Sequence, residues 1–182
     1  MYQFLAQLKY FLGGQTRIQP LPMHQLTEQL KLVSITGRMA YAITCLEIII
    51  RDEKLNEVEF QPLLDALWDF TSNPDLSDWE ELIMPFIPDS EIPGQKYDYK
   101  PYQHLSQELL ACIDEIIEVG RGNLYAGVRT HSPATLESTL QVVRYMLANN
   151  HPLPLIENFQ RSPFTLQDQH GWGKRLNRDF FQ

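Results

Sequence analysis

The sequence predicts an all-α fold: a single-domain bundle of about six helices around a long central apolar helix, with an extended C-terminal tail. Apolar residues recur at spacings of three and four along most of the chain. No stretch shows the sustained apolar–polar alternation of a half-buried strand. A chain of 182 residues that is 43% hydrophobic buries roughly 70% of its unfolded surface without needing a disulfide or a metal. We therefore expect one helical domain over residues 1–182.

The long central helix is predicted from residues 23–52, after a first short helix over residues 4–12 that two glycines end. Between Leu32 and Leu46 its only charged residue is Arg38. A helix that is apolar nearly all round normally has neighbours on several sides. This segment is therefore expected to form the centre of the bundle.

Two capping signals predict the next helices. Asn56, followed three residues later by Glu59, indicates the start of a third helix. Ser77 with Glu80 indicates the start of a short fourth helix that runs through Phe86.

The second half of the chain contains two further helices. The connection 88–101 is the longest predicted loop before residue 150, and its last residue, Pro101, suits the first position of a helix. The apolar stripe that follows ends at the glycine-containing loop 120–131. Ser132, followed by proline, predicts the start of a helix over 133–148.

The tail, residues 152–182, mixes aromatic and turn-forming residues without a clear period. We expect it to be irregular and packed on the helical body. Within it the segment 170–173 (His-Gly-Trp-Gly) predicts a turn that packs Trp172 against the body. Three basic residues follow this turn: Lys174, Arg175 and Arg178.

The sequence favours a reduced, cytoplasmic protein. Cys45 and Cys112 lie in apolar stretches and are expected to be buried thiols. The apolar N-terminus lacks the basic region and cleavage site of a signal peptide. Arg38 and Glu47 interrupt the longest apolar stretch, so no membrane span is expected.

Catalytic and cofactor motifs are missing. The glycines of the 120–131 loop lack the spacing and the lysine of a phosphate-binding loop, and no Gly-x-Ser-x-Gly occurs. None of the histidines has a second histidine or cysteine at metal-ligand spacing. The pairs Asp65/Asp69 and Asp114/Glu118 stand one helical turn apart, which is typical of a solvated face. We therefore predict no catalytic residue, no metal and no cofactor.

The negative charge is concentrated in one segment. Residues 47–91 contain thirteen acidic and two basic residues, a net charge of −11, whereas the remaining ten acidic and thirteen basic residues give +3. Such a segment repels nucleic acid and accelerates encounters with basic protein surfaces. Two interpretations stay open: a hydrated face, or a face that binds a basic protein.

The candidate binding residues come from the middle of this segment. Trp68 is spaced with neighbouring leucines and is expected in the core, whereas Trp79 is a candidate interface anchor among acids. The predicted partner-binding residues are Asp65, Asp69, Asp75, Asp78, Trp79 and Glu81.

Two other kinds of function remain as alternatives. The 120–131 loop, with Arg121, Tyr125 and Arg129, could serve an enzyme or a small-ligand protein together with the C-terminal arginines. A pocket lined by these side chains would support that alternative. A structural subunit would instead require an extensive apolar homodimer surface.

Five stretches in this order carry a resemblance: residues 38–47 (RMAYAITCLE), 67–72 (LWDFTS), 78–80 (DWE), 123–127 (NLYAG), and the ending HGWG at 170–173 followed by two phenylalanines at 180–181. Together they resemble a family of small, uncharacterised bacterial helical proteins. Members of that family are similar to the immunity proteins that protect cells against secreted polymorphic toxins. The resemblance implies a non-enzymatic protein that neutralises a partner toxin, and the acidic segment would suit a basic toxin domain.

Overall fold

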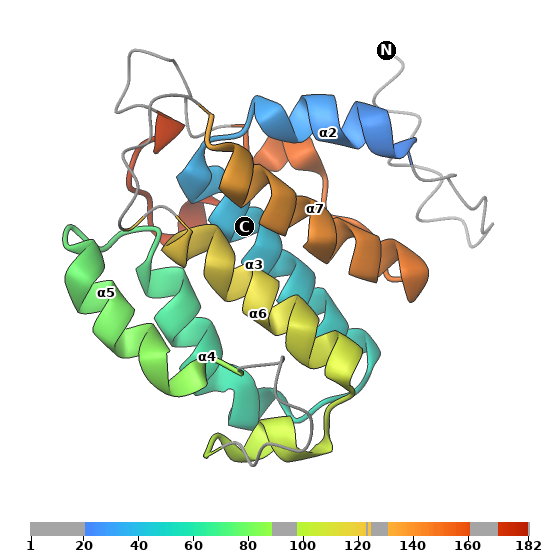
Figure 1. The fold of residues 1–182 in the computed structure, drawn as a ribbon, viewed down its shortest axis with the longest axis vertical. Coiled ribbons are helices and arrows are strands. Elements are labelled where there is room, and N and C mark those ends of the chain that lie inside the picture. Colours follow the sequence, from blue (N-terminus) through green and yellow to red (C-terminus); the bar gives the residue numbers. More distant parts are fainter. Residues whose placement is uncertain (1–20, 89–97, 123, 125–130, 161–170, 182) are drawn as a thin grey trace.

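The computed structural model describes residues 21–88, 98–122, 124, 131–160 and 171–181 (Figure 1). These residues contain no strand, so the all-α prediction is confirmed. The predicted helix 4–12 lies outside the described residues. The α-helices are α2 (Met23–Lys31), α3 (Ile35–Asp52), α4 (Glu57–Asp69), α5 (Leu76–Ile83), α6 (Gln107–Arg121) and α7 (Pro133–Ala148). Short 3₁₀ turns are η1 (Met84–Phe86), η2 (Lys100–His104), η3 (Ile156–Asn158) and η5 (Arg178–Phe180).

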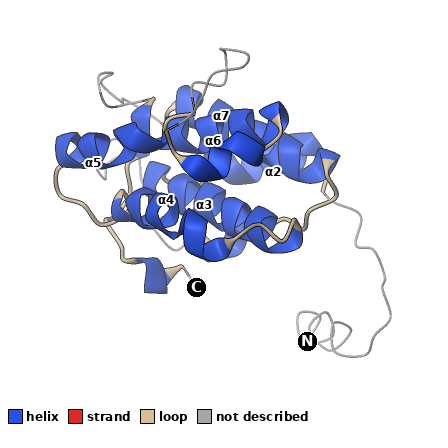
Figure 2. Ribbon diagram, turned by 90° about the horizontal axis from the view of Figure 1, so that it is seen from below, coloured by secondary structure: helices blue, strands red, loops and turns tan. Residues whose placement is uncertain are grey.

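Helix α3 lies at the centre of the molecule. Figure 2 shows α6 and α7 on one side of α3, α4 beside it, and the C-terminal end of the chain on the opposite side. Thirteen of the 18 residues of α3 are buried, which requires neighbours around most of its circumference. The prediction of a central apolar helix is therefore confirmed.

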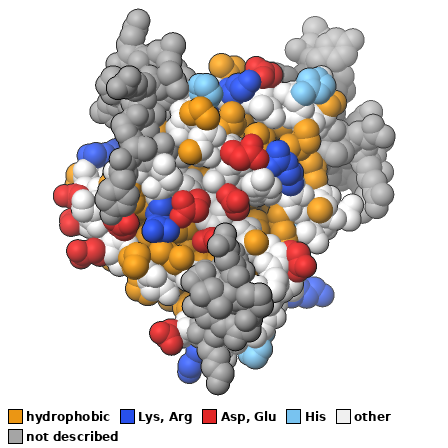
Figure 3. Space-filling model, viewed as in Figure 1, with side chains coloured by type: hydrophobic (Ala, Val, Ile, Leu, Met, Phe, Trp, Pro, Cys, Tyr) orange, Lys and Arg blue, Asp and Glu red, His pale blue; other side chains and the backbone are white. Residues whose placement is uncertain are grey.

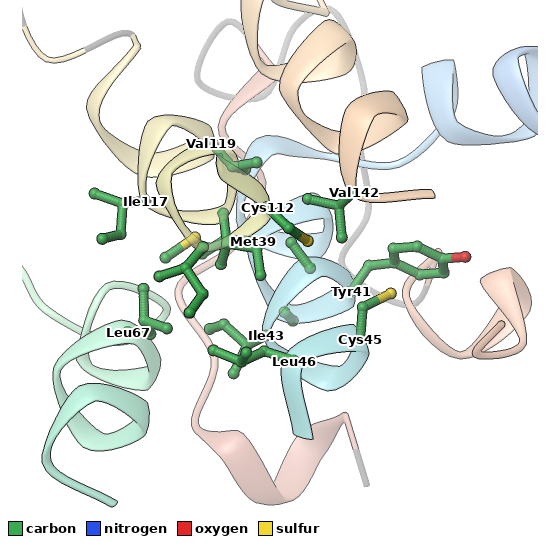
Figure 4. Close-up of a cluster of buried hydrophobic side chains, with 14 of the residues drawn as sticks. Met39, Tyr41, Ile43, Cys45, Leu46, Leu67, Cys112, Ile117, Val119 and Val142 are labelled. Atoms are coloured by element: carbon green, nitrogen blue, oxygen red, sulfur yellow. The ribbon is translucent and has the colours of Figure 1, made fainter. Parts of the chain in front are cut away.

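The core forms where side chains of α3 meet those of α4, α6 and α7 (Figure 4). Met39, Ile43 and Leu46 of α3 are fully buried there, as are Leu67 of α4 and Ile117 of α6. This single apolar cluster extends from α2 to Phe181 near the C-terminus. One cluster of this extent joins the described helices and tail into one body.

The predicted continuous helix 23–52 is wrong, because the chain turns between α2 and α3. The Ser34 side chain caps α3 by accepting the Gly37 N–H at 3.0 Å. Leu32, in the turn, is 65% exposed. Apolar spacing continues across this turn, so periodicity alone did not reveal it.

Arg38 is the side chain that holds the turn in place. Its Nε donates to the Leu30 carbonyl at 3.0 Å, and Nη2 donates to the Lys31 carbonyl at 3.4 Å. Both carbonyls belong to the last turn of α2, where they have no later helical N–H to accept. The arginine therefore caps α2 from within α3.

The same guanidinium also fixes the start of α7. Nη1 donates to the carbonyls of His131 at 2.6 Å and Ser132 at 3.0 Å, and to Thr135 Oγ1 at 2.9 Å. Ser132 caps α7 as predicted, accepting the Thr135 N–H at 3.2 Å. Its backbone has a positive φ of 45°, a conformation that serine rarely adopts. The bonds to Arg38 stabilise that conformation.

The Arg38 side chain is fully buried, and none of these five acceptors is a carboxylate. Burial lowers the pKa of Arg38 to about 10, which still leaves the guanidinium charged at neutral pH. The negative end of the α2 dipole favours a cation at this position.

Of three predicted helix starts, the structure confirms one and corrects two. Asn56 caps α4 as expected, accepting the Val58 N–H at 3.2 Å. The predicted capping box at Ser77 is wrong: Asp75 caps α5 and accepts the Ser77 N–H at 2.9 Å. Pro101 lies in η2 rather than in a long helix, and α6 begins only at Gln107 after the cap Ser106. In both corrections an equally good capping residue lies a few positions away.

Gly120, predicted as the first residue of a loop, lies inside α6 and is buried. A Cβ atom at this position would lie 2.4 Å from Cη2 of Trp79. The glycine therefore allows the Trp79 ring to pack directly against the α6 backbone, a contact that spacing along the chain does not reveal.

We expect Arg38→Met to lower the free energy of unfolding by about 3 kcal/mol or more, because five hydrogen bonds to the end of α2 and the start of α7 are lost, among them those to the Lys31 and His131 carbonyls. Urea denaturation measures this change. The matched control is Arg51→Met at the exposed end of the same helix, which should change stability by less than about 0.5 kcal/mol. Similar stabilities for the two variants would contradict the structural role of Arg38.

Candidate functional site

The outward side of α5 carries a group of acidic side chains. Asp78 and Glu81 are exposed and, like the capping residue Asp75, form no ion pair with a described residue. Spacings of three along a helix place these three residues on neighbouring positions of one face. Figure 3 shows acidic side chains gathered over α5 at the left edge of the molecule. We call Asp75, Asp78 and Glu81 the α5 acidic stripe.

Trp79 does not belong to this surface. Its side chain is fully buried, its indole N–H donates to the Ala66 carbonyl at 2.8 Å, and its ring packs edge-on against Phe70 at 4.8 Å. The prediction of Trp79 as an interface anchor is wrong. Because α5 has only eight residues, this one large side chain fastens it to α4 and α6.

Two exposed apolar side chains accompany the α5 acidic stripe. Leu82, one turn after Asp78, is 49% exposed, and Met84, in the following 3₁₀ turn, is 54% exposed. Neither residue is among the partner-binding residues that the sequence predicts, because local spacing does not show which apolar side chains of a short helix stay exposed. Half-exposed apolar groups beside charges are typical of the contacts that stabilise a bound partner.

Asp65 and Asp69 form a second acidic pair on α4. Asp65 is exposed and accepts a hydrogen bond from Gln61 at 2.6 Å, and Asp69 is half-buried and accepts one from Asn73 at 2.5 Å. Val58, seven residues before Asp65, is 82% exposed on the same side of the helix. This face is polar and solvated, with one isolated apolar residue.

Other acids of the acidic segment have structural partners. Glu47 accepts a hydrogen bond from the Trp68 indole at 2.9 Å and pairs with Arg178 at 2.6 Å. Glu53 lies 3.1 Å from the His151 ring and accepts a hydrogen bond from the Tyr145 hydroxyl at 3.2 Å. These acids, and Asp52 beside His151, are therefore engaged within the body, whereas the remaining described acids of residues 47–91 lie on α4, on α5 or in the turn between them.

The tail is held on the body by paired hydrogen bonds at two threonines. The Trp172 carbonyl accepts both the N–H of Thr36, at 3.0 Å, and its hydroxyl, at 2.8 Å. The Leu176 N–H donates to the Thr71 carbonyl at 2.8 Å, and the Thr71 hydroxyl donates back to the Leu176 carbonyl at 2.7 Å. We call these bonds the tail clasp.

Gly171 and Gly173 allow the clasp to form. Their φ values are +98° and +79°, in the region that favours glycine, and they reverse the chain on either side of Trp172. Beyond the clasp, Phe181 is buried against Phe159 and Trp68, and the Arg178 guanidinium lies 5.5 Å from the Trp68 ring centre. The predicted turn at residues 170–173 is therefore present from Gly171 onward, and it packs the tail on the body.

A hollow of about 480 Å³ opens beside the tail clasp. Its lining comes from the start of α3, the α4–α5 turn and the tail, namely Thr36, Phe70, Asn73, Leu76, Trp172, Gly173 and Arg175. A shallower groove of about 370 Å³ runs between α6 and α7, with Ala111, Cys112 and Tyr145 among its lining residues. The first hollow includes one of the predicted C-terminal arginines.

The 120–131 loop is only partly described. Tyr125 and Arg129 lie outside the described residues. Arg121 pairs with Glu118 at 2.8 Å, and neither Arg121 nor His131 lines either hollow. Neither of these two hollows is therefore the pocket that the ligand-binding alternative requires at this loop.

Neither thiol has the environment of a nucleophile. Cys45 and Cys112 are free and buried, and burial raises the pKa of both thiols well above the usual value. Among the described residues no three His, Cys, Asp or Glu side chains form a group that could hold a metal ion. In the described part of the chain no helix is long and apolar enough to cross a membrane.

The comparisons with known proteins return nothing on which a family assignment can rest. No family model matches the chain, and neither a curated protein nor a solved structure is significantly similar to it.

We predict that neither thiol reacts with Ellman's reagent in the folded protein within minutes, because both are buried and protonated. Two equivalents should react once urea unfolds the chain. Rapid labelling of one native thiol would contradict the protonated, inert state that the structure indicates.

We expect Phe181→Ala to loosen the tail clasp, because Phe181 anchors the chain beyond it. Hydrogen exchange of the Leu176 and Thr36 amides should accelerate at least about tenfold, with little change in α6 and α7. Phe180→Ala, at a neighbouring exposed residue, is the control and should leave exchange unchanged. A uniform acceleration across the protein would show that the tail does not open as a separate unit.

Proposed function

We propose that this protein is a non-enzymatic binding module that recognises a basic partner protein through α5, and that the partner is a toxin domain that it neutralises. The observation that carries the proposal is the combination of Asp75, Asp78 and Glu81, which have no ion pair with a described residue, with the half-exposed Leu82 and Met84. The toxin as partner rests on the family resemblance of the sequence.

The charge arrangement supports a basic partner. Unpaired carboxylates on one face produce a local negative potential, which accelerates diffusional encounter with a positive surface. A solvated face needs no apolar groups, whereas Leu82 and Met84 provide area that a partner can remove from water. The acids would then set the association rate, and the apolar groups would set the dissociation rate.

The scaffold under α5 supports a pre-organised surface. Trp79 fastens α5 through its hydrogen bond to Ala66, its contact with Phe70 and its packing on Gly120. A surface that is ordered before binding loses less conformational entropy on association. Such a surface suits a protein whose function is to hold a partner tightly.

The two free, buried thiols fit the cytoplasm as the place where the protein acts, and this location belongs to the proposal. The proposal also expects a neighbouring gene that encodes a secreted protein with a C-terminal toxin domain. That purified domain is the partner to be used in the binding experiment.

We expect the double reversal Asp78→Lys/Glu81→Lys to slow association with the toxin domain by about tenfold or more and to weaken its salt dependence. Leu82→Ala and Met84→Ala should mainly raise the dissociation rate. Stopped-flow and surface-binding kinetics separate the two effects. The reversal should cost only about 0.5–1 kcal/mol in stability, since Asp78 lies in the first turn of α5.

The matched control is Glu28→Lys/Glu157→Lys, which changes the net charge equally at exposed residues outside α4 and α5. It should slow association much less than the α5 reversal does. Equal effects of the two double variants would show that only the total charge matters. Wild-type kinetics for all the α5 variants would remove α5 from the interface.

A further inference from the structure

We propose that the hollow beside the tail clasp is a binding site for a small organic monocarboxylate with an apolar body. The site is separate from the outward face of α5, and the inference does not depend on the proposed partner protein. Its volume of about 480 Å³ lies within the range of roughly 300–1,000 Å³ that is usual for small-molecule sites.

The walls of the hollow select an apolar body. The lining surface is mostly apolar and includes the side chains of Phe70, Leu76 and Trp172, with the ring centres of Phe70 and Trp172 6.3 Å apart and the rings inclined by 35°. Gly173 adds no side chain, and its positive φ of 79° bends the tail around the opening. Leu76 and Trp172 are only half-buried, so a ligand would remove apolar surface from water.

The charges around the hollow select one negative charge. Arg175 is exposed, lines the hollow and forms no ion pair with a described residue. A guanidinium binds a carboxylate through two parallel hydrogen bonds. Thr36, in the first turn of α3, also lines the hollow, but its N–H and hydroxyl both donate to the Trp172 carbonyl, so Arg175 is the lining residue that supplies a positive charge.

Nearby acids limit the charge that the ligand can carry. The lining residue Asn73 is hydrogen-bonded to two acidic residues. Its side-chain amide N–H donates to the Asp69 carboxylate, and its side-chain oxygen accepts the backbone N–H of Asp75. The Asp69 carboxylate therefore adjoins the lining through Asn73. It repels a doubly charged phosphate more strongly than a monocarboxylate, whose single charge Arg175 can bind.

Three tryptophan indoles give a site-specific measurement. Neither Trp68 nor Trp79 lines the hollow, and their indole N–H groups donate to Glu47 and Ala66, so both serve as internal references. The probe is 3-phenylpropionate, titrated into the ¹⁵N-labelled full chain. We expect the Trp172 indole resonance, assigned with Trp172→Phe, to shift with saturation while the other two stay fixed. Octanoate as a second probe distinguishes a preference for an aromatic body from one for a linear body.

Two comparisons test the charge. The alcohol 3-phenylpropanol has the same body without the carboxylate and should bind at least about tenfold more weakly. Arg175→Gln should remove this difference by weakening binding of the acid alone. Lys174→Gln is the matched control, since Lys174 is the adjacent cation and does not line the hollow.

Leu76→Trp tests whether the probe binds inside the hollow. The larger side chain fills the hollow and should abolish the shift of the Trp172 indole resonance. No shift of the Trp172 resonance at millimolar probe would overturn the proposal. Equal binding of the acid and the alcohol, or Arg175→Gln binding the acid like the wild type, would overturn it as well.

Discussion

The buried guanidinium of Arg38 is the interaction on which the arrangement of the helices depends. It is a charge at the centre of the molecule with five uncharged acceptors around it, contributed by the end of α2 and the start of α7. Every acceptor is a backbone or hydroxyl oxygen. The Leu30 and Ser132 carbonyls also accept the N–H groups of Val33 and Leu136, whereas Arg38 is the donor given to the Lys31 and His131 carbonyls, and a carbonyl without a donor is costly inside a protein. Since α2 ends and α7 begins at this side chain, one residue of α3 fixes the positions of two neighbouring helices.

The tail is also attached by hydrogen bonds to backbone groups of the helical body. The start of α3 has N–H groups that need acceptors, and the Trp172 carbonyl supplies one at Thr36. At Thr71 the chain beyond α4 supplies a donor and an acceptor to Leu176. Apolar contacts of Phe181 then close the surface over Trp68. Polar groups thus set the register of the tail, and apolar groups supply most of its stabilisation.

Two groups of described acidic residues have different consequences. Glu47, Asp52 and Glu53 are engaged with Trp68, Arg178, His151 and Tyr145, and they join parts of the body. The α5 acidic stripe forms no ion pair with a described residue and lies beside exposed apolar groups, which is why the proposed partner site is placed there. The hollow borders the N-terminal end of α5, since Leu76, the first residue of that helix, lines the hollow. The variants on the outward face of α5 and the variants in the hollow test these two sites separately.

The sequence by itself determined the helical class, the central apolar helix, and the caps at Asn56 and Ser132. These features depend on residues three or four positions apart, so local spacing contains the information. It also located the concentration of acidic charge. Only the tertiary structure decided that Trp79 is buried, that α2 and α3 are separate, and that Leu82 and Met84 are exposed. Those outcomes depend on contacts between distant segments: Trp79 with Gly120, and Arg38 with residues 131–135. The tail clasp joins residues 136 and 105 positions apart, and no local pattern encodes which carbonyl will meet which donor once the chain has folded.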